Sequence, residues 1–322
     1  MEKLPDPVQY AIPAFVALII IEMIWAKRRA PDKYEPKDTL NSLLFGFGST
    51  VAGALFGAMM IGIAYSAYAL RPFTIPWTWW AWGLCFILDD LAYYVFHRSA
   101  HRIRWFWASH VNHHSSQHYN LSTALRQSWT GFFAVGFIFR LPLAFIGFHP
   151  AMLLFCGALN LIYQFWIHTE SIRRMPRWFE AVMNTPSHHR VHHAVNPRYL
   201  DRNYAGTFIV WDKMFGTFTP EVGDEPIRYG IVKQLGNFNL LWGVFHEWVG
   251  IFQDLWRAPF KAKLGYLIGP PGWSHDGSRD TSDMIRERWE SAIDPQVRSS
   301  RAKSRDVDEH TGVSTTLDTN GV

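Results

Sequence analysis

The sequence predicts an all-α fold: an integral-membrane helical bundle of about four to five spans with a histidine-rich helical cap on the cytoplasmic side. Three observations lead to this prediction. Long apolar runs recur through the first half of the chain, aromatic residues make up 16% of it against 18% charged residues, and twelve of the fifteen histidines lie between His97 and His193. The low charged fraction and the net charge of +4 favour neither a disordered chain nor a nucleic-acid partner.

Two apolar runs near the N-terminus predict the first spans. Residues 8–26 are long enough to cross about 30 Å of hydrocarbon. Their basic residues follow the run, whereas a cleaved signal peptide carries them in front. We therefore expect residues 1–39 to form a membrane anchor and a basic linker. The second run, residues 40–70, is rich in Gly and Ala, which suits close helix packing in lipid.

Three further runs complete the predicted bundle. Residues 77–96 open with the Trp-rich sequence WTWWAW, which is typical of a membrane interface. Residues 129–148 and 151–167 form the fourth and fifth runs, and His149-Pro150 joins them as a tight hairpin tip.

Lys and Arg residues predict the orientation. They gather in residues 27–37, 98–126 and 173–177, and alternation through five spans places all three segments on one side of the membrane. The positive-inside rule makes that side cytoplasmic, and the histidine clusters fall there too. We expect the inner membrane of a bacterium or the endoplasmic reticulum of a eukaryote.

The C-terminal third is more polar. Residues 221–273 are expected to form an interfacial helical segment, because residues 240–256 carry apolar and Trp residues at helical spacing interrupted by His246, Glu247 and Asp254. Residues 274–322 are short of aromatic residues and are expected to be disordered.

Neither a cysteine site nor a nucleotide site is predicted. Cys85 and Cys156 both lie inside apolar runs, which argues against a disulfide scaffold and a thiolate metal site. The only Gly-rich candidate, residues 46–48, lies within an apolar span and is better explained by helix packing.

Three histidine clusters predict a metal site. They read HRSAH, HVNHH and HRVHH, and spacings of three and four place side chains on one helix face, about 5–6 Å apart at Cβ. Eight imidazoles exceed what one tetrahedral zinc ion uses, so two metal ions are expected, and imidazole accepts iron, copper, nickel or zinc. The eight residues are His97, His101, His110, His113, His114, His189, His192 and His193.

Two polar stripes extend the candidate site. Asp90, Tyr94, His97 and His101 form one stripe, and an acid inside a membrane helix marks a functional candidate. We expect Asp90 to face the metal cavity and orient an imidazole; the alternatives are an inter-helix hydrogen bond or pairing with Arg140.

Asn160, Gln164 and His168 form the second stripe, at four-residue spacing. His168 is predicted to be a ninth ligand, and Asn160 and Gln164 could bind or support the metals. His188 could be a ligand or a donor to one, and His118 is expected beside the site. The remaining histidines carry no predicted role: His149, His246, His275 and His310.

These clusters resemble those of the fatty acid hydroxylase/sterol desaturase superfamily of integral-membrane di-iron proteins. The resemblance covers roughly residues 41–220 and includes NTPSHHRVHHAVNPRYLDRNYAGTFIVWDKMFGTF at residues 184–218. YQFWIHTE at residues 163–170 is most similar to the branch that holds alkylglycerol monooxygenase and bacterial sterol-desaturase-like proteins. Residues 40–220 are accordingly expected to form a membrane-bound di-iron hydroxylase or desaturase domain.

The resemblance implies that the eight cluster histidines, with His168, hold two iron ions. It implies an oxidoreductase that uses O₂ to hydroxylate or desaturate a lipid: a sterol, fatty acyl chain, glycerol ether or carotenoid. Zinc could replace iron in purified protein. A separate reductase, small cytochrome or ferredoxin would supply electrons. Arg102 departs from the glycerol-ether branch, which has an acid there. Residues 105–107 could line the lipid entrance.

Three other interpretations were weighed. A membrane metal carrier or sensor would spread its ligands across the bilayer, whereas these gather on one side. A haem electron carrier would place paired histidines mid-span. A zinc hydrolase would continue His246-Glu247 to a second histidine four residues on, and the sequence does not.

Overall fold

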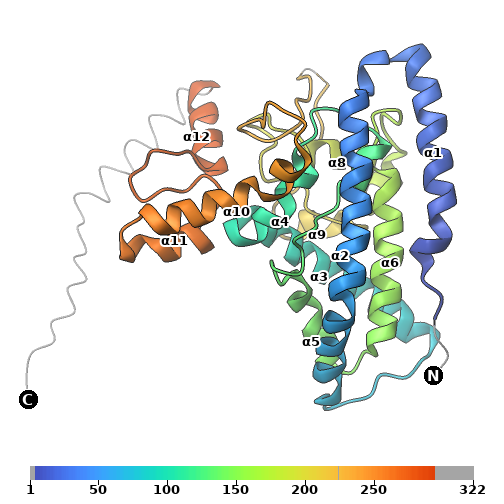
Figure 1. The fold of residues 1–322 in the computed structure, drawn as a ribbon. Coiled ribbons are helices and arrows are strands. Elements are labelled where there is room, and N and C mark those ends of the chain that lie inside the picture. Colours follow the sequence, from blue (N-terminus) through green and yellow to red (C-terminus); the bar gives the residue numbers. More distant parts are fainter. Residues whose placement is uncertain (1–3, 224, 294–322) are drawn as a thin grey trace, which may run out of the picture.

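The protein is all-helical in the computed structural model, which describes residues 4–223 and 225–293 (Figure 1). No β-strand occurs in these ranges. Two isolated bridges join Met183 to Phe208 and Ala194 to Tyr229. The predicted all-α class is confirmed.

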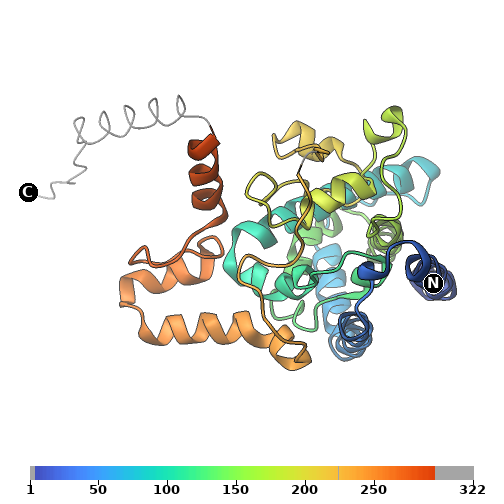
Figure 2. The same cartoon turned by 90° about the horizontal axis from the view of Figure 1, so that it is seen from above.

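Helices α1 (Pro7–Arg29), α2 (Pro36–Ala69) and α6 (Pro150–Trp166) form the long axis of the molecule. They run side by side in Figure 1 and are seen end-on in Figure 2. Each helix has a proline in its first turn, where no intrahelical hydrogen bond is lost. The short turn η1 (Pro31–Lys33) links α1 to α2.

Two segments of the described chain are long and apolar enough to cross a membrane, judged by length and composition. They are α1 and Pro31–Ala69, which contains α2, and only 11% and 6% of their most apolar windows are buried. The predicted count of four to five spans is not confirmed. Helix α3 (Trp79–Arg102) carries two acids, Asp89 and Asp90, and α6 has only 17 residues.

The prediction of one span over residues 129–148 is wrong. This run forms turns, then η3 (Gly136–Arg140) and α5 (Leu141–Ile146). Val135 adopts a left-handed backbone with φ of 53°, and Gly147, with φ of 128°, ends α5. A Cβ at Gly147 would lie 2.4 Å from the Phe73 carbonyl oxygen, so only glycine fits this close crossing.

The remaining helices surround the end of the bundle where α1 ends and α2 begins. Helix α4 turns back from α3 after Ile103, which has an extended backbone. The elements in chain order are α4 (Arg104–His114), η2 (Leu121–Leu125), α7 (Arg177–Glu180), α8 (Pro186–His192), α9 (Val210–Met214), α10 (Leu240–Arg257), η4 (Phe260–Ala262), α11 (Lys263–Ile268) and α12 (Ser282–Ile293).

The polar tail is not disordered throughout. Residues 282–293 form α12, which is held by ion pairs between Asp283 and both Arg102 and Arg286. The expectation of disorder from residue 274 is therefore wrong for this helix, and residues 294–322 lie outside the described residues. Cys85 and Cys156 are free and lie in a buried apolar cluster.

Candidate metal centre

Nine buried or half-buried imidazoles form two adjacent clusters. Within each cluster the candidate ligand atoms lie within 4.8 Å of one another. The first cluster contains His97, His101, His110, His114 and His192, and the second contains His113, His168, His189 and His193. The structure thus brings together all nine histidines that the sequence singles out. Their role as metal ligands stays a prediction.

Helical spacing divides the second and third histidine boxes between the two clusters, while both histidines of the first box, His97 and His101, belong to the first cluster. On α4, His110 and His114 belong to the first cluster and His113 to the second. On α8 and its C-terminal cap, His192 belongs to the first cluster and His189 and His193 to the second. Residues four apart share a helix face while adjacent residues diverge. An adjacent His-His pair therefore serves two neighbouring sites.

Backbone carbonyl groups fix the protonation of four imidazoles. A carbonyl oxygen only accepts hydrogen bonds, so the Nδ1 facing it must carry the proton and Nε2 keeps its lone pair. The Nδ1-to-oxygen distances are 2.7 Å from His97 to Tyr204, 3.2 Å from His113 to Arg126, 2.7 Å from His168 to Gln164 and 3.0 Å from His192 to Arg202.

One pair of ring nitrogens faces each other without a proton to share. The Nε2 atoms of His113 and His168 lie 3.3 Å apart, and both are acceptors because both Nδ1 atoms donate. Two lone pairs at this distance repel unless a cation lies between them. The Nε2 atoms of His101 and His192 are buried without a hydrogen-bond partner. This donor set fits a metal ion in each cluster.

Burial favours the neutral form of seven of these imidazoles by lowering the pKa. It lowers the pKa of His168 to about 4, and it holds the pKa of His113 and His189 well below the ordinary value, with neighbouring imidazoles adding to the effect. The same direction and cause apply to His110, His114, His192 and His193. Neutral imidazole is the form that binds metal.

Asp90 does not orient an imidazole directly, so that prediction is wrong. Its carboxylate accepts hydrogen bonds from the Asn160 amide at 2.8 Å, the Thr207 and Phe208 backbone N–H groups at 2.7 and 3.0 Å, and the Trp211 indole at 2.9 Å. The inter-helix alternative is the one observed. The other alternative is wrong, because Arg140 pairs with Asp89 instead.

Asp90 acts on the site through the backbone. It holds the segment around Gly206, where a Cβ would come within 2.8 Å of the Asp90 and Asn160 side-chain oxygens. The same segment supplies the Tyr204 carbonyl that fixes His97. Asp90 therefore supports His97 indirectly, through this backbone segment.

The other possible ligands lie outside both clusters. Gln164 supports His168 through its backbone carbonyl, and its side chain donates to Asn160 at 2.8 Å. The His118 ring contacts the Asp32 carbonyl oxygen at 3.1 Å. His188 is buried with its ring centroid 5.4 Å from that of Phe218.

Sequence reasoning missed Glu22, a buried acid on α1. Its carboxylate accepts hydrogen bonds from the Tyr34 hydroxyl at 2.6 Å, the Leu121 N–H at 2.8 Å, the Ser171 hydroxyl at 2.9 Å and the Thr169 hydroxyl. Thr169 follows His168, so α1 is joined to the second cluster. The rule that singled out Asp90, an acid within an apolar run, would also have found Glu22.

Two further pairs were missed because they join distant parts of the sequence. Asp201 lies 3.4 Å from the His101 ring nitrogen Nδ1 and also pairs with Arg102. Arg126, whose carbonyl contacts His113, forms an ion pair with Asp38 on α2 at 2.9 Å. No local pattern predicts either contact.

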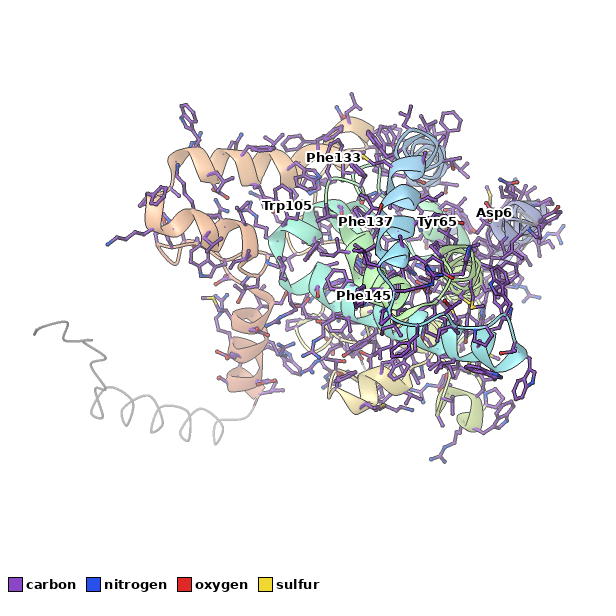
Figure 3. All side chains as sticks on the ribbon, turned by 90° about the horizontal axis from the view of Figure 1, so that it is seen from below. Asp6, Tyr65, Trp105, Phe133, Phe137 and Phe145 are labelled. Atoms are coloured by element: carbon purple, nitrogen blue, oxygen red, sulfur yellow. The ribbon has the colours of Figure 1, made fainter. Side chains whose placement is uncertain are left out.

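An apolar cavity of about 1330 Å³ extends along α6, and none of the nine cluster histidines lines it. Its wall includes Asp6, Tyr65 and Phe137, which are labelled in Figure 3. At one end it includes Gln164 and Tyr93, and the ring centroid of Tyr93 lies 5.2 Å from that of His97.

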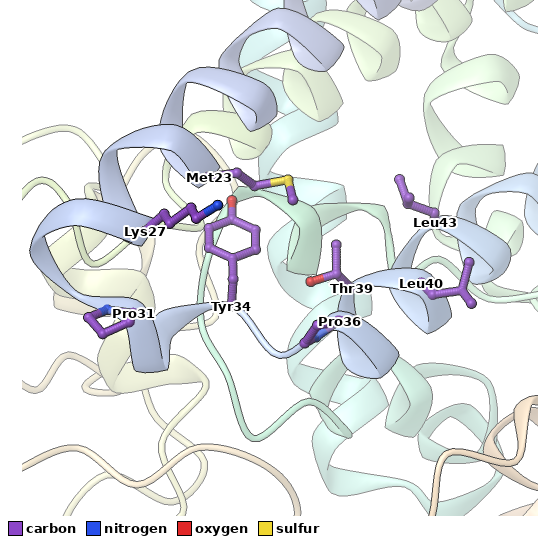
Figure 4. A pocket seen from close by; sticks show the side chains of 8 residues that line it. All are labelled: Met23, Lys27, Pro31, Tyr34, Pro36, Thr39, Leu40 and Leu43. Atoms are coloured by element: carbon purple, nitrogen blue, oxygen red, sulfur yellow. The ribbon is translucent and has the colours of Figure 1, made fainter.

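The aromatic residues 105–107, expected at a lipid entrance, do not line this cavity. The Trp107 ring lies against the rings of His101 and His114, at 5.1 and 5.6 Å between centroids. A smaller cavity of about 410 Å³ lies between the end of α1 and the start of α2, beside Tyr34 (Figure 4).

Fold and site together define a helical protein with two adjacent all-histidine clusters. Comparison with known families matches residues 82–217 to the fatty acid hydroxylase family. All nine cluster histidines lie within the matched residues. Residues 82–217 of this chain are thus similar to the fatty acid hydroxylase family.

Curated relatives agree with this family. The chain is 40% identical to alkylglycerol monooxygenase of Xenopus tropicalis over 281 residues and 39% identical to that of Homo sapiens over 279 residues; each match covers 85% of this chain and 61% of the relative. It is 27% identical to cholesterol 25-hydroxylase of Homo sapiens over 146 residues, which cover 41% of this chain and 49% of the relative.

The chain spans about three fifths of the length of the monooxygenases it matches. Overall identity therefore points to the same relatives, the alkylglycerol monooxygenases, as the segment YQFWIHTE does. No solved structure matches the chain.

Proposed function

We propose that the protein is a membrane-bound, non-haem di-iron oxidoreductase that uses O₂ to hydroxylate or desaturate a lipid. The observation that carries the proposal is the pair of all-imidazole clusters beside a long apolar cavity, whose wall residue Tyr93 contacts His97. Two iron ions held there would supply O₂ reduction and the oxidation of an unactivated C–H bond. Zinc could occupy the same imidazoles in purified protein.

The exposed apolar surface of α1 and α2 supports a membrane location. Large side chains such as Ile21, Phe47 and Leu55 are 62%, 70% and 70% exposed. An apolar surface of this extent is unfavourable in water and is expected in lipid. The basic residues that end α1, Lys27 to Arg29, support a cytoplasmic location for the histidine-rich end of the bundle.

The first cluster would hold one iron ion with His97, His101, His110, His114 and His192. The second would hold the other with His113, His168, His189 and His193. The carbonyl groups behind four of these rings keep Nε2 aimed at the metal before it binds. The protein's contribution is thus a preorganised, neutral and largely buried ligand set.

The cavity would bind the lipid and exclude water. Its wall is mainly apolar, and the charge of Arg140 is neutralised by Asp89 at 2.6 Å. Tyr93, which contacts His97, would position the hydrocarbon chain of the lipid next to the metals. The names of the most similar relatives make a glycerol ether the first substrate to test, followed by sterols and fatty acyl chains.

Electrons would come from a separate reductase, small cytochrome or ferredoxin. The chain has two cysteines, both buried in an apolar cluster, so it offers no cysteine set for an iron–sulfur centre. Purified protein that oxidised lipid with only NADPH and O₂ would overturn this part of the proposal.

Lipid mass spectrometry of cells with and without the gene tests the function. We expect a lipid class whose mass shifts by one oxygen or two hydrogens, and we expect the shift to disappear in a His192→Ala variant that still inserts in membranes. An unchanged lipid profile combined with altered cellular metal content would favour a metal carrier or sensor instead.

A further inference from the structure

An exposed apolar face runs along α10, η4 and α11. On α10 its residues follow one another at steps of four, seven and four, which places them on one side of the helix. All of them are more than two fifths exposed. We call this surface the α10–α11 face; its residues are Leu241, Phe245, Phe252, Trp256, Phe260, Leu264 and Ile268.

The direction of α10 is that of a helix lying on a membrane. In Figure 1, α10 extends sideways from the bundle, across the direction of α1, α2 and α6. Figure 2 looks down the bundle and shows those three helices end-on and α10 lengthwise. If α1 and α2 cross a bilayer, α10 therefore runs along its surface.

The α10–α11 face begins beside the apolar surface of α2. The Asn41 amide on α2 donates to the Phe238 carbonyl just before α10 at 3.0 Å. Phe45 packs against Gly243, where a Cβ would lie 2.8 Å from the Phe45 ring. Neighbouring residues of α2, Leu40 and Phe47, are 55% and 70% exposed. The apolar surface of the candidate span thus lies next to the start of α10.

Basic residues beside the α10–α11 face make it complementary to an anionic surface. Arg257, Lys261 and Lys263 lie between the apolar residues, and the sequence has no acid from Leu255 to His275. Aromatic residues interleaved with basic ones are typical of helices that bind in the headgroup region of anionic membranes.

The opposite side of α10 packs on the metal-binding part of the protein. Arg104, at the start of α4, pairs with Glu247 and Asp254 of α10 at 2.6 Å each. Trp105 packs edge-on against Trp248, with ring centroids 4.9 Å apart. Helix α4 carries three of the nine cluster histidines. One side of α10 therefore packs on the rest of the protein, and the α10–α11 face on its other side is exposed.

We propose that the α10–α11 face docks on the anionic surface of the bilayer. Its aromatic and aliphatic side chains enter the boundary between headgroups and acyl chains, while Arg257, Lys261 and Lys263 contact lipid phosphates. This inference rests on the membrane location in the proposed function and is independent of the metals and of the reaction. Docking would hold α4, and with it the clusters, at a fixed height above the lipid.

Spin-label depth measurements on the full chain test the proposal. Nitroxide labels are placed by Phe252→Cys and Trp256→Cys, with Glu287→Cys on α12 as the matched control; the native cysteines are buried. The protein is reconstituted in phosphatidylcholine bilayers with or without phosphatidylglycerol. Labels at 252 and 256 should be reached by membrane-dissolved oxygen and shielded from a water-soluble nickel complex, and the label at 287 should show the reverse.

The charge component has its own test. Phosphatidylglycerol should draw the label at 256 deeper, and the R257Q/K261Q/K263Q variant should lose that difference. Equal nickel access at 252, 256 and 287 overturns docking. Shielding from both reagents overturns it in favour of a protein partner. Metal content, measured on each variant, confirms folding, and a protein that docks but never oxidises lipid would refute only the proposed function.

Discussion

At the residue scale, site residues that a short sequence spacing marks could be predicted. Site residues that only the folded chain brings together could not. The nine cluster histidines could be found because spacings of three and four mark one helix face. Asp201, which lies 3.4 Å from His101, could not be found, because 100 residues separate the two in sequence. Asp90 was singled out correctly as unusual, but two of its partners are backbone groups that no side-chain pattern reveals.

Glu22 is expected to position the second cluster. In Glu22→Leu the Leu121 N–H and three hydroxyl groups lose their acceptor, and each buried unsatisfied group costs about 1–3 kcal/mol. We expect a lower melting temperature and selective loss of the metal bound by His168 and its neighbours, with the first cluster still loaded. Elemental analysis and the absorption of the cobalt-substituted protein measure this.

The matched control for Glu22 is Ile21→Ala, an exposed position on the same helix. It should leave metal content and melting temperature unchanged. Equal loss of metal from both clusters in Glu22→Leu would show general destabilisation instead of positioning.

Gly206 is expected to be intolerant of a side chain. An alanine Cβ would press on the Asp90 and Asn160 oxygens, and overpacking of a buried site costs about 1–3 kcal/mol. Gly206→Ala should therefore lower the melting temperature and weaken metal retention by the first cluster, since the same segment fixes His97. Gly83→Ala, where no atom lies within 4 Å, is the control and should behave as wild type.

At the element scale, hydropathy located α1, α2, α3 and α6 but failed over residues 129–148. That run is apolar enough for a span, yet Val135 and Gly147 take backbone angles that interrupt a helix. A hydropathy window does not register such angles. The sequence also placed an amphipathic helix at residues 240–256, where α10 is observed, and missed α12 because its support is ionic.

The attachment of α10 should weaken in acid. Burial alone would raise the pKa of Asp254, but hydrogen bonds from Arg279 and Arg104 outweigh it and hold the pKa below the ordinary value. The stabilisation is present above the unfolded-state pKa of about 3.9 and is lost as the pH falls through the folded-state value. The melting temperature should therefore drop below about pH 4.

Asp254→Asn tests this assignment. The variant should be less stable at neutral pH and should lose less stability on acidification than wild type. Glu287→Gln, an exposed change on α12, should reproduce the wild-type profile. An Asp254→Asn profile parallel to wild type would show that other carboxylates govern the acid transition.

At the scale of the whole molecule, the all-α class and the nine cluster histidines could be predicted from the sequence. The arrangement of the helices in space could not. Residues 4–8 and several residues between 149 and 164 lie far apart in sequence yet line one cavity. The sideways course of α10 and α11 depends on contacts with α2 and α4 that only the folded chain reveals.

Metal removal should loosen the whole histidine-rich end of the molecule. Ions that bind only the folded state stabilise it by mass action, and without them acceptor atoms such as those of His113 and His168 face each other at 3.3 Å. We expect chelation to lower the melting temperature and to speed amide hydrogen exchange in α4 and α8, with α2 unaffected. If chelation left amide hydrogen exchange in α4 and α8 unchanged, the assignment of a metal ion to the histidine clusters would be contradicted.

The division of each His-His pair also sets an order of assembly. Both clusters draw on α8, so neither is complete until translation has passed residue 193, when α1, α2 and α3 have long left the ribosome. In the proposed di-iron protein, neither iron ion would have its full ligand set before the N-terminal half of the chain has inserted. Maturation would then be a final, post-insertional event, and cells short of iron should accumulate correctly targeted but inert protein.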